Sequence, residues 1–421
     1  MHSKTLLRPL LQAATLLLCI FNLAHAGEPP TEPLLRIDPG EHTAIITRIA
    51  SDSAGRYLVT ASEDKTARVW SLADGRLLNT LRIPIGSGNE GKLYAVALSP
   101  DGNTVALGGW TGWDYDGSPS IFLFDRASGR LLRRLTGQPQ GILHLAFSPD
   151  GRSLAATLGD QGLRLFALAD GRLLAEDSAY GAASYSAHFS PAASNSDARL
   201  VTTSLDGYLR LYRFDGTTLT LLAKRAAPGG KQPFAARFSP DGTRIAVGFA
   251  DTPAVNVLKA GDLTLDYAPD TAGVRGDFGR VAWAQQGEAL LAGGRAMTSG
   301  SHFIRRWTRQ GQGEFADWPV ADSTLMDITP LPQGKLAFGG GGPNWGVVNP
   351  AGQRTLFHAP AVADFRDNRE GFTLSADGAQ VRFGYEYGGK APAVFDSQRR
   401  AFVAERVNPS RLSRKSATAG A

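Results

Sequence analysis

The sequence of 421 residues contains a single cysteine, Cys19, which lies near the N-terminus. A mature chain that has lost this segment has no disulfide, no thiolate metal ligand and no cysteine nucleophile, so its core alone must hold it together. Lysine supplies only 9 of the 44 basic residues, and no block of like charge is long enough for a nucleic-acid-binding arm. The hydrophobic content of 43% is that of a globular protein and excludes disorder of the whole chain.

Long apolar runs are missing except at the N-terminus. There Lys4 and Arg8 precede an almost wholly apolar stretch, residues 10–24, and Ala24-His25-Ala26 is a small-x-small cleavage site before Gly27. This layout predicts a secretory signal peptide over residues 1–26 and a periplasmic or secreted protein, with a retained anchor as the alternative. The apolar run is short for a membrane span, and none is expected in the mature chain. Loss of Lys4 and Arg8 lowers the net charge from +5 to +3, which argues against a dedicated polyanion binder.

Glycine is abundant, with 49 residues, and much of it lies in a repeated turn. Ser-Pro-Asp-Gly ends at Gly102, Gly151 and Gly242, a near copy ends at Gly378, and weaker copies end at Gly55, Gly287 and Gly334. An eighth copy opens at Ser190 and is stretched by residues 192–197. In each turn Pro presets φ, Asp bonds its own backbone, and Gly takes the positive φ.

Each repeat of about 46 residues contains four short extended segments. One precedes the turn, a second follows it, a third carries a bulky residue, and a fourth follows a second turn such as Ala-Asp-Gly-Arg. This is the pattern of one blade of a β-propeller. Eight third strands are expected, at Trp70, Phe124, Phe166, Tyr212, Leu258, Trp307, Val348 and Phe395.

We therefore predict an all-β, eight-bladed β-propeller over residues 27–407, with seven blades as the alternative and a disordered tail over 408–421. Residues 323–358 form the unit most at risk of standing outside the ring, because its strands are short and Gly-rich. Residues 33–37 look like a fourth strand that seals the ring within the last blade, which would leave residues 402–406 surplus or paired elsewhere.

The repeats resemble WD repeats. Gly40-Glu41-His42 stands at the Gly-His position of that family and Trp70 at its Trp position, although Ser71 replaces the usual Asp. The turn Asp before the third strand is represented by Asp64, Asp160, Asp206 and Asp251. The resemblance implies an interaction platform. More narrowly, residues 42–387 are similar to the propeller region of bacterial exported proteins that carry a caspase-like peptidase domain. That domain is absent here, so the similarity implies the sensing or docking half alone.

Catalytic motifs are mostly absent, and no enzyme activity, cofactor or metal is predicted. Residues 86–91 match Gly-x-Gly-x-x-Gly, but a strand follows instead of a helix, which predicts a loop between blades. His144 and His188 lie in first strands, which line the channel, and packed or hydrogen-bonded roles are favoured over a shared metal. Residues 114–118 resemble a calcium loop, yet Pro119 replaces its essential Gly, which favours a solvated insertion.

The loops are unequal on the two faces of the predicted ring. The Ser-Pro-Asp-Gly and Ala-Asp-Gly-Arg turns share one face, here called the short-turn face. The blade-to-blade connections and the loops between second and third strands share the other, the long-loop face. Long loops on a rigid scaffold concentrate binding residues, and aromatic and Arg side chains dominate interfaces. The predicted contact residues are Trp110, Trp113, Tyr115, Arg275, Arg295, Trp345, Arg366, Arg369, Tyr385 and Tyr387.

Three functions follow from these patterns. The first is a non-enzymatic propeller that binds a protein or peptide, as a sensor or scaffold, on the long-loop face. The second is a carbohydrate or cell-wall glycan binder, in which exposed Trp and Tyr stack on sugar rings. The third is an enzyme with a site in the channel, for which no nucleophile, metal cluster or carboxylate pair can be named. No nucleic-acid partner is expected.

Overall fold

The repeated turns have the geometry that their residues predict. A computed structural model describes residues 38, 40–191, 198–284, 286–360, 373–383, 393–399 and 401–404. Gly102, Gly151 and Gly242 have φ of 75°, 71° and 69°, a region that favours glycine. The N–H of Gly102 donates to the carbonyl of Ser99 at 2.8 Å, and the Ser99 hydroxyl donates to the Asp101 carboxylate at 2.5 Å. Each turn is thereby closed by its own side chains.

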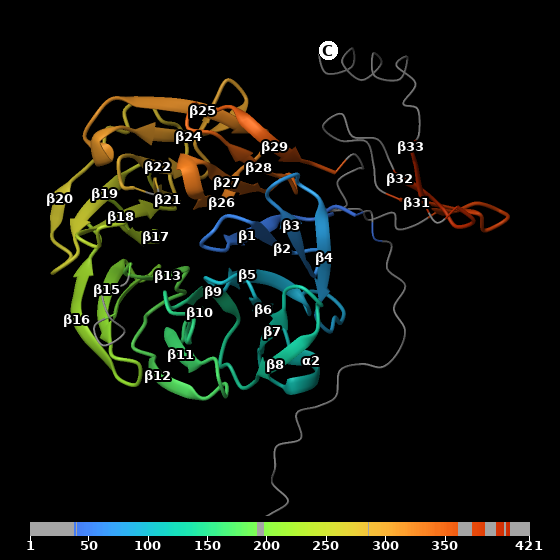
Figure 1. The fold of residues 1–421 in the computed structure, drawn as a ribbon, viewed down its shortest axis with the longest axis horizontal. Helices are drawn as coiled ribbons and strands as arrows, with labels where there is room; N and C mark the ends of the chain where they lie inside the picture. The colour runs from blue at the N-terminus through green and yellow to red at the C-terminus, as the bar shows by residue number, and fades with distance from the viewer. Residues whose placement is uncertain are drawn as a thin grey trace, which may run out of the picture.

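The turns join strands into antiparallel sheets, seven of which surround a central axis (Figure 1). The first sheet contains β1 (Ile46–Ser51), β2 (Tyr57–Ser62), β3 (Thr66–Ser71) and β4 (Leu77–Arg82). The second contains β5 (Lys92–Leu98), β6 (Thr104–Trp110), β7 (Ile121–Asp125) and β8 (Leu131–Leu135). The third contains β9 (Ile142–Phe147), β10 (Ser153–Leu158), β11 (Leu163–Ala167) and β12 (Leu173–Asp177). The fourth contains β13 (Ser186–Phe189), β14 (Ala198–Thr203), β15 (Tyr208–Phe214) and β16 (Leu219–Ala226).

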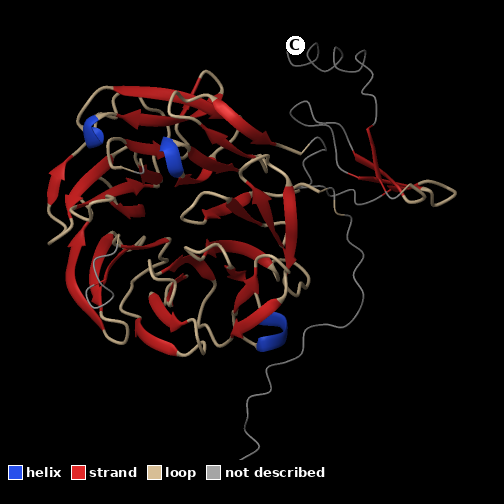
Figure 2. Ribbon diagram, in the orientation of Figure 1, coloured by secondary structure: helices blue, strands red, loops and turns tan. Residues whose placement is uncertain are grey.

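The remaining sheets of the ring follow the same order, and strands account for almost all of its regular structure (Figure 2). The fifth contains β17 (Pro233–Phe238), β18 (Arg244–Phe249), β19 (Val255–Lys259) and β20 (Leu265–Tyr267). The sixth contains β21 (Arg280–Trp283), β22 (Leu290–Gly293), β24 (Ser301–Trp307) and β25 (Phe315–Ala321), with β23 (Met297–Thr298) paired to β24. The seventh contains β26 (Leu325–Pro330), β27 (Leu336–Gly340), β28 (Trp345–Val348) and β29 (Arg354–His358). The short helices are α2 (Trp113–Asp116), η2 (Arg309–Gly311) and η3 (Pro332–Gly334).

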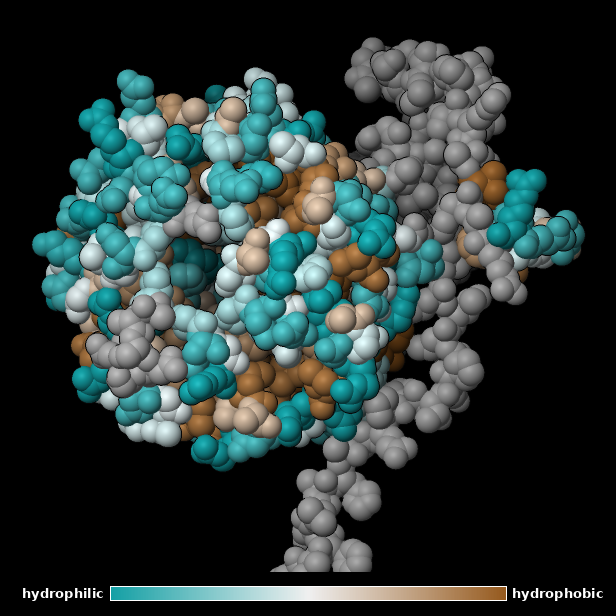
Figure 3. Space-filling model, viewed as in Figure 1, coloured by the Kyte–Doolittle hydropathy of each residue, from teal (hydrophilic) through white to brown (hydrophobic). Residues whose placement is uncertain are grey.

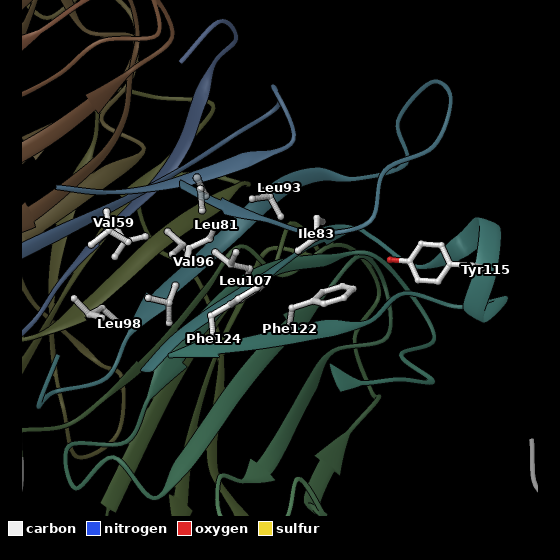
Figure 4. Packing of buried hydrophobic residues seen from close by; sticks show 14 residues of the cluster. Val59, Leu81, Ile83, Leu93, Val96, Leu98, Leu107, Tyr115, Phe122 and Phe124 are labelled. Carbon is white, nitrogen blue, oxygen red and sulfur yellow. The ribbon is translucent and has the colours of Figure 1, made fainter. Parts of the chain in front are cut away.

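Apolar side chains fill the spaces between neighbouring sheets. Between the first and second sheets, Val59 and Leu81 meet Val96, Leu107 and Phe122 in one cluster (Figure 4). Because each sheet is covered on both faces, its inner strands are buried almost throughout, as in β10, instead of alternating between apolar and polar. This burial explains why the strands in the sequence lack a clean period of two.

The ring closes directly between the seventh sheet and the first. The indoles of Trp70 in β3 and Trp345 in β28 lie 5.1 Å apart, and both are buried. The N–H of Ile49 in β1 donates to the carboxylate of Asp327 in β26 at 3.2 Å. The seventh sheet takes its four strands from residues 325–358. The described ring therefore has seven sheets and corresponds to the seven-bladed alternative, not to the predicted eight.

The eighth predicted unit folds into a sheet of its own. It contains β30 (Thr373–Leu374), β31 (Gln380–Phe383), β32 (Ala393–Asp396) and β33 (Ala401–Ala404), and Figure 1 shows β31–β33 beside the ring. The unit that stands apart is thus the last one and not residues 323–358, whose apolar side chains pack in the closure. The proposed sealing strand at 33–37, the signal segment 1–26 and the tail 408–421 lie outside the described residues.

A buried network in the first sheet joins residues that the WD resemblance identified. The His42 imidazole lies 2.8 Å from the Asp64 carboxylate and 2.7 Å from the Thr60 hydroxyl, which also accepts the Trp70 indole N–H at 2.9 Å. Burial alone would raise the pKa of Asp64. The charge and hydrogen bond of His42, with hydrogen bonds from Thr66 and Thr43, outweigh it and hold that pKa below its ordinary value.

The network predicts how stability depends on pH. The pKa of Asp64 is lower in the folded chain than its ordinary value of 3.8, so the unfolded chain binds more protons below that value and stability falls as the pH falls. Asp64→Asn should lower the free energy of unfolding by about 1–3 kcal/mol at pH 7. As the pH falls below about 5, the variant should lose less stability than the wild type. Thermal unfolding at a series of pH values measures both effects.

Asp74→Asn is the matched control, because Asp74 lies in a turn of the same sheet with its side chain 58% exposed. This change should shift stability by less than about 0.5 kcal/mol at pH 7. If Asp64→Asn and Asp74→Asn gave the same curves, the buried network would not be stabilising the first blade.

Candidate functional site

The long-loop face carries an aromatic pair on the second blade. Trp110 is exposed, Trp113 is half-buried, and their rings lie 5.2 Å apart. The buried Glu90 carboxylate organises this loop by accepting the backbone N–H groups of Gly112 at 2.5 Å and Trp113 at 3.1 Å. Glu90 belongs to the Gly-rich segment 86–91, which is a loop between blades as predicted. The loop fixes α2 and leaves the Trp110 indole exposed, whereas the indole N–H of Trp113 is buried.

Two of the predicted aromatic contact residues are core residues instead. Tyr115 is only 8% exposed, points from α2 into the cluster between the first and second sheets, and packs beneath its own loop (Figure 4). Trp345 is 1% exposed and stacks on His358 with ring centroids 4.5 Å apart, within the closure of the ring. Sequence placed both in long loops, but the sheets bury them, so neither forms an exposed contact surface.

The two predicted arginines that the structure describes lie on a different blade from Trp110 and Trp113. Arg275 and Arg295 are both exposed and lie beside the sixth blade. Arg295 forms an ion pair with Asp277, and the backbone of Arg275 pairs with that of Met297 in an isolated β-bridge. The second and sixth blades are not neighbours in a ring of seven, so the predicted set does not form one patch. The other four predicted residues, Arg366, Arg369, Tyr385 and Tyr387, lie outside the described residues.

An aromatic cluster at the mouth of the channel was missed in the sequence. Tyr94, Tyr185 and Phe234 lie near the starts of the first strands β5, β13 and β17, the ends that face the long-loop side. All three are half-buried. The rings of Tyr185 and Phe234 stack with centroids 4.6 Å apart. The guanidinium of Arg280 lies 4.0 Å from the centre of the Phe234 ring, and that of Arg48 lies 5.8 Å from it. The mouth is therefore a fixed apolar surface backed by cations.

Deeper in the channel, the first strands contribute an excess of positive charge. Arg48, Arg280 and Asp327 are buried, and the partly buried Arg237 lies nearer the short-turn face. Arg48 donates to the carbonyl of Tyr185 at 2.7 Å and lies 3.9 Å from Asp327, while Arg280 donates to the carbonyl of Met326. The signal for these residues was present in the repeat. Arg48, His144, Arg280 and Asp327 each lie seven residues before the glycine of their turn.

Burial and mutual repulsion shape the titration of this cluster. Burial lowers the pKa of Arg237 to about 10, with Asp327 opposing the shift and Arg48 adding to it. Burial, and then the charge of Arg237, lowers the pKa of His188 to about 3. Burial, followed by the charges of Arg48 and Arg237, also holds the pKa of His144 well below its ordinary value. Both histidines are therefore neutral at pH 7.

The short-turn end of the channel contains a cavity of about 460 Å³. Its walls include Phe147, Phe238 and Trp283, and its rim includes Pro100 and Pro240. Its polar lining includes His144, His188, Arg237 and Asp327, with Ser51, Ser53, Thr329 and Asp52, which is paired with Arg56 at 2.7 Å. The space-filling view shows the ring hollowed near its centre (Figure 3). An apolar cavity with a few convergent polar groups is the usual form of a small-ligand site.

The histidines are hydrogen-bonded in the channel wall, the role favoured from sequence. His144 Nδ1 accepts the N–H of Ala187 at 3.4 Å, and His188 Nδ1 accepts the N–H of Phe238 at 3.1 Å. In the part of the chain that the structure describes, no three His, Cys, Asp or Glu side chains are placed to hold a metal ion. The calcium-like segment is instead held by protein contacts, since Asp116 accepts the Ser120 hydroxyl and pairs with Arg134 at 3.3 Å.

None of the helices in the described residues is long and apolar enough to span a bilayer.

Comparison with known proteins identifies the repeats. The family model "WD domain, G-beta repeat" matches residues 34–71 and 129–166. The chain is 28% identical over 149 residues to Coronin-7 of Rattus norvegicus, which is 35% of this chain and 15% of that protein. It is 31% identical over 122 residues to the small ribosomal subunit protein RACK1y of Oryza sativa subsp. japonica, 28% of this chain and 32% of that protein. It is 27% identical over 201 residues to the LST8 homolog of Drosophila melanogaster, 44% of this chain and 56% of that protein.

The alignments thus span between 15% and 56% of the length of these relatives. The matched repeats, the four-stranded sheets and the buried His42, Asp64 and Trp70 network agree with one another. The fold is an all-β propeller of the WD-repeat type.

Proposed function

We propose that this protein is an exported, non-enzymatic propeller that binds a protein or peptide segment at the long-loop mouth of its channel. The observation that carries the proposal is the half-buried stack of Tyr185 and Phe234, backed by Arg48 and Arg280. Aromatic side chains supply much of the energy of protein interfaces. These rings are already held by their neighbours, so a partner that packs on them loses little further side-chain entropy.

The WD-type repeats support a binding role, because the resemblance implies an interaction platform. The narrower similarity, to the propeller region of bacterial exported proteins with a caspase-like domain, implies a sensing or docking role, which we propose as well. In this view the partner is a protein or peptide of the compartment to which the chain is exported.

A second candidate function, glycan binding, is favoured by one specific observation. Trp110 and Trp113 form an indole pair on the same face, one exposed and one half-buried. Aromatic rings of this kind can stack on the apolar faces of sugar rings. The pair lies on the second blade, away from the stack of Tyr185 and Phe234, so variants separate the two candidates.

The binding proposal predicts that Phe234→Ala weakens partner capture by about 2 kcal/mol or more, the loss typical of an interface hot spot. Phe357→Ala is the matched control, because Phe357 is 41% exposed on the outer strand β29. Immobilised wild type and both variants are incubated with periplasmic extract, and the bound proteins are quantified by mass spectrometry. A partner captured equally by all three would place recognition elsewhere on the ring.

A glycan array probed with the wild type, Trp110→Ala and Phe234→Ala tests the second candidate. Array signal that Trp110→Ala abolishes and Phe234→Ala leaves intact would replace the peptide proposal with the glycan one.

Export rests on residues 1–26 and predicts a defined N-terminus. Signal peptidase cleavage after Ala26 would leave Gly27 as the first residue of the exported protein. Intact-mass measurement of the protein from its native compartment checks this prediction. Recovery of the chain with Met1 retained, in the membrane fraction, would contradict it and indicate an uncleaved anchor.

A further inference from the structure

The charges in the channel do not balance within the part of the ring that the structure describes. Arg48, Arg237 and Arg280 face the carboxylate of Asp327, and Arg280 also faces Asp277, which is paired with Arg295. Asp327 is already engaged, since it accepts the N–H groups of Ile49 at 3.2 Å and Ile328 at 3.0 Å. Uncompensated buried charge is costly, so this arrangement favours the entry of an anion.

Arg237 is the guanidinium at the cavity. One of its nitrogens donates to the Ser186 hydroxyl at 2.9 Å and to the carbonyl of Ala236 at 3.0 Å. Among the residues placed by the structure, no carboxylate forms an ion pair with Arg237, whereas Arg48 is beside Asp327. A guanidinium carries five N–H donors in a planar fork that suits the oxygens of a carboxylate or phosphate.

The two histidines add neutral donors to the same cavity. A backbone N–H can only donate, so Nδ1 of His144 and Nδ1 of His188 must be the unprotonated acceptors of Ala187 and Phe238. In each neutral ring the proton is therefore on Nε2. Since both rings line the cavity, these Nε2–H groups are donors available to a ligand there.

From these contacts we propose that the cavity at the short-turn end of the channel binds the oxyanion of a small organic ligand, a carboxylate or a phosphate. Arg237, His144 and His188 supply the donors for the oxyanion. The walls formed by Phe147, Phe238 and Trp283 hold the apolar part of the ligand. The site lies at the end of the channel opposite the Tyr185 and Phe234 stack, so it stands independently of the function proposed above.

The test measures binding of inorganic phosphate and of citrate, at constant ionic strength set with sodium chloride, by isothermal titration calorimetry and by thermal unfolding. The wild type should bind at least one of these probes saturably, with a midpoint of unfolding that rises with probe concentration. Binding of phosphate alone would indicate a phosphate site, and binding of citrate alone would indicate a carboxylate site. Binding of both would indicate a site that accepts either oxyanion. Arg237→Gln should weaken binding at least tenfold.

Arg213→Gln is the matched control, since Arg213 is exposed on β15, and it should bind as the wild type does. Labelling of the wild type with phenylglyoxal provides a measurement that needs no variant. The bound probe should protect Arg237 from modification and leave Arg213 labelled as before. Equal binding by the wild type and Arg237→Gln, no protection of Arg237, or no saturable binding of either probe would overturn the proposal.

Discussion

The contact between the first and seventh sheets is the constraint on which the ring depends. Asp327 is central to it, because its carboxylate accepts the N–H of Ile49 across the joint and lies beside Arg48. Trp70, Trp345 and His358 fill the space farther out with three mutually contacting rings. The remaining joints connect sheets that are consecutive in the chain, whereas this one brings together residues 278 positions apart, so the core must hold the ring shut without a disulfide.

Closure also determines the chemistry of the channel. Once seven sheets surround the axis, the first strands bring Arg48, Arg237 and Arg280 together. Burial lowers the pKa of all three, and the charge of Arg48 lowers the pKa values of Arg237 and Arg280 further. Asp327 thus closes the ring and offsets part of this charge. The two ends of the channel differ accordingly, with stacked aromatic rings at the long-loop mouth and hydrogen-bond donors at the short-turn cavity.

Local features of the fold could be predicted from sequence because they depend on neighbouring residues. The turn glycines have positive φ, and all eight predicted third-strand residues, from Trp70 to Phe395, lie in third strands. Closure could not be predicted, because the repeat spacing does not say whether the last unit enters the ring. The exposure of the predicted contact residues was harder to predict for a related reason. Trp345 and Tyr115 follow Gly-rich, irregular sequence, but the structure places them in β28 and α2, where the adjacent sheets bury them. Phe234 and Arg237 lie in an ordinary strand that meets the channel.

The most direct test of the account is the distance between the first and seventh blades. A Cβ at Gly55 would come within 2.5 Å of the Pro332 ring, so the turns of these blades are neighbours. The mature chain predicted from residue 27 has no cysteine, so pairs of spin labels can be introduced at Ala54 with Asn103, Arg152 or Lys335 and measured by pulsed electron paramagnetic resonance. Asn103 and Arg152 lie one and two blades beyond the first. Direct closure predicts that the Ala54–Lys335 distance matches Ala54–Asn103, whereas a match to Ala54–Arg152 would show that an eighth blade separates the two and would contradict the account.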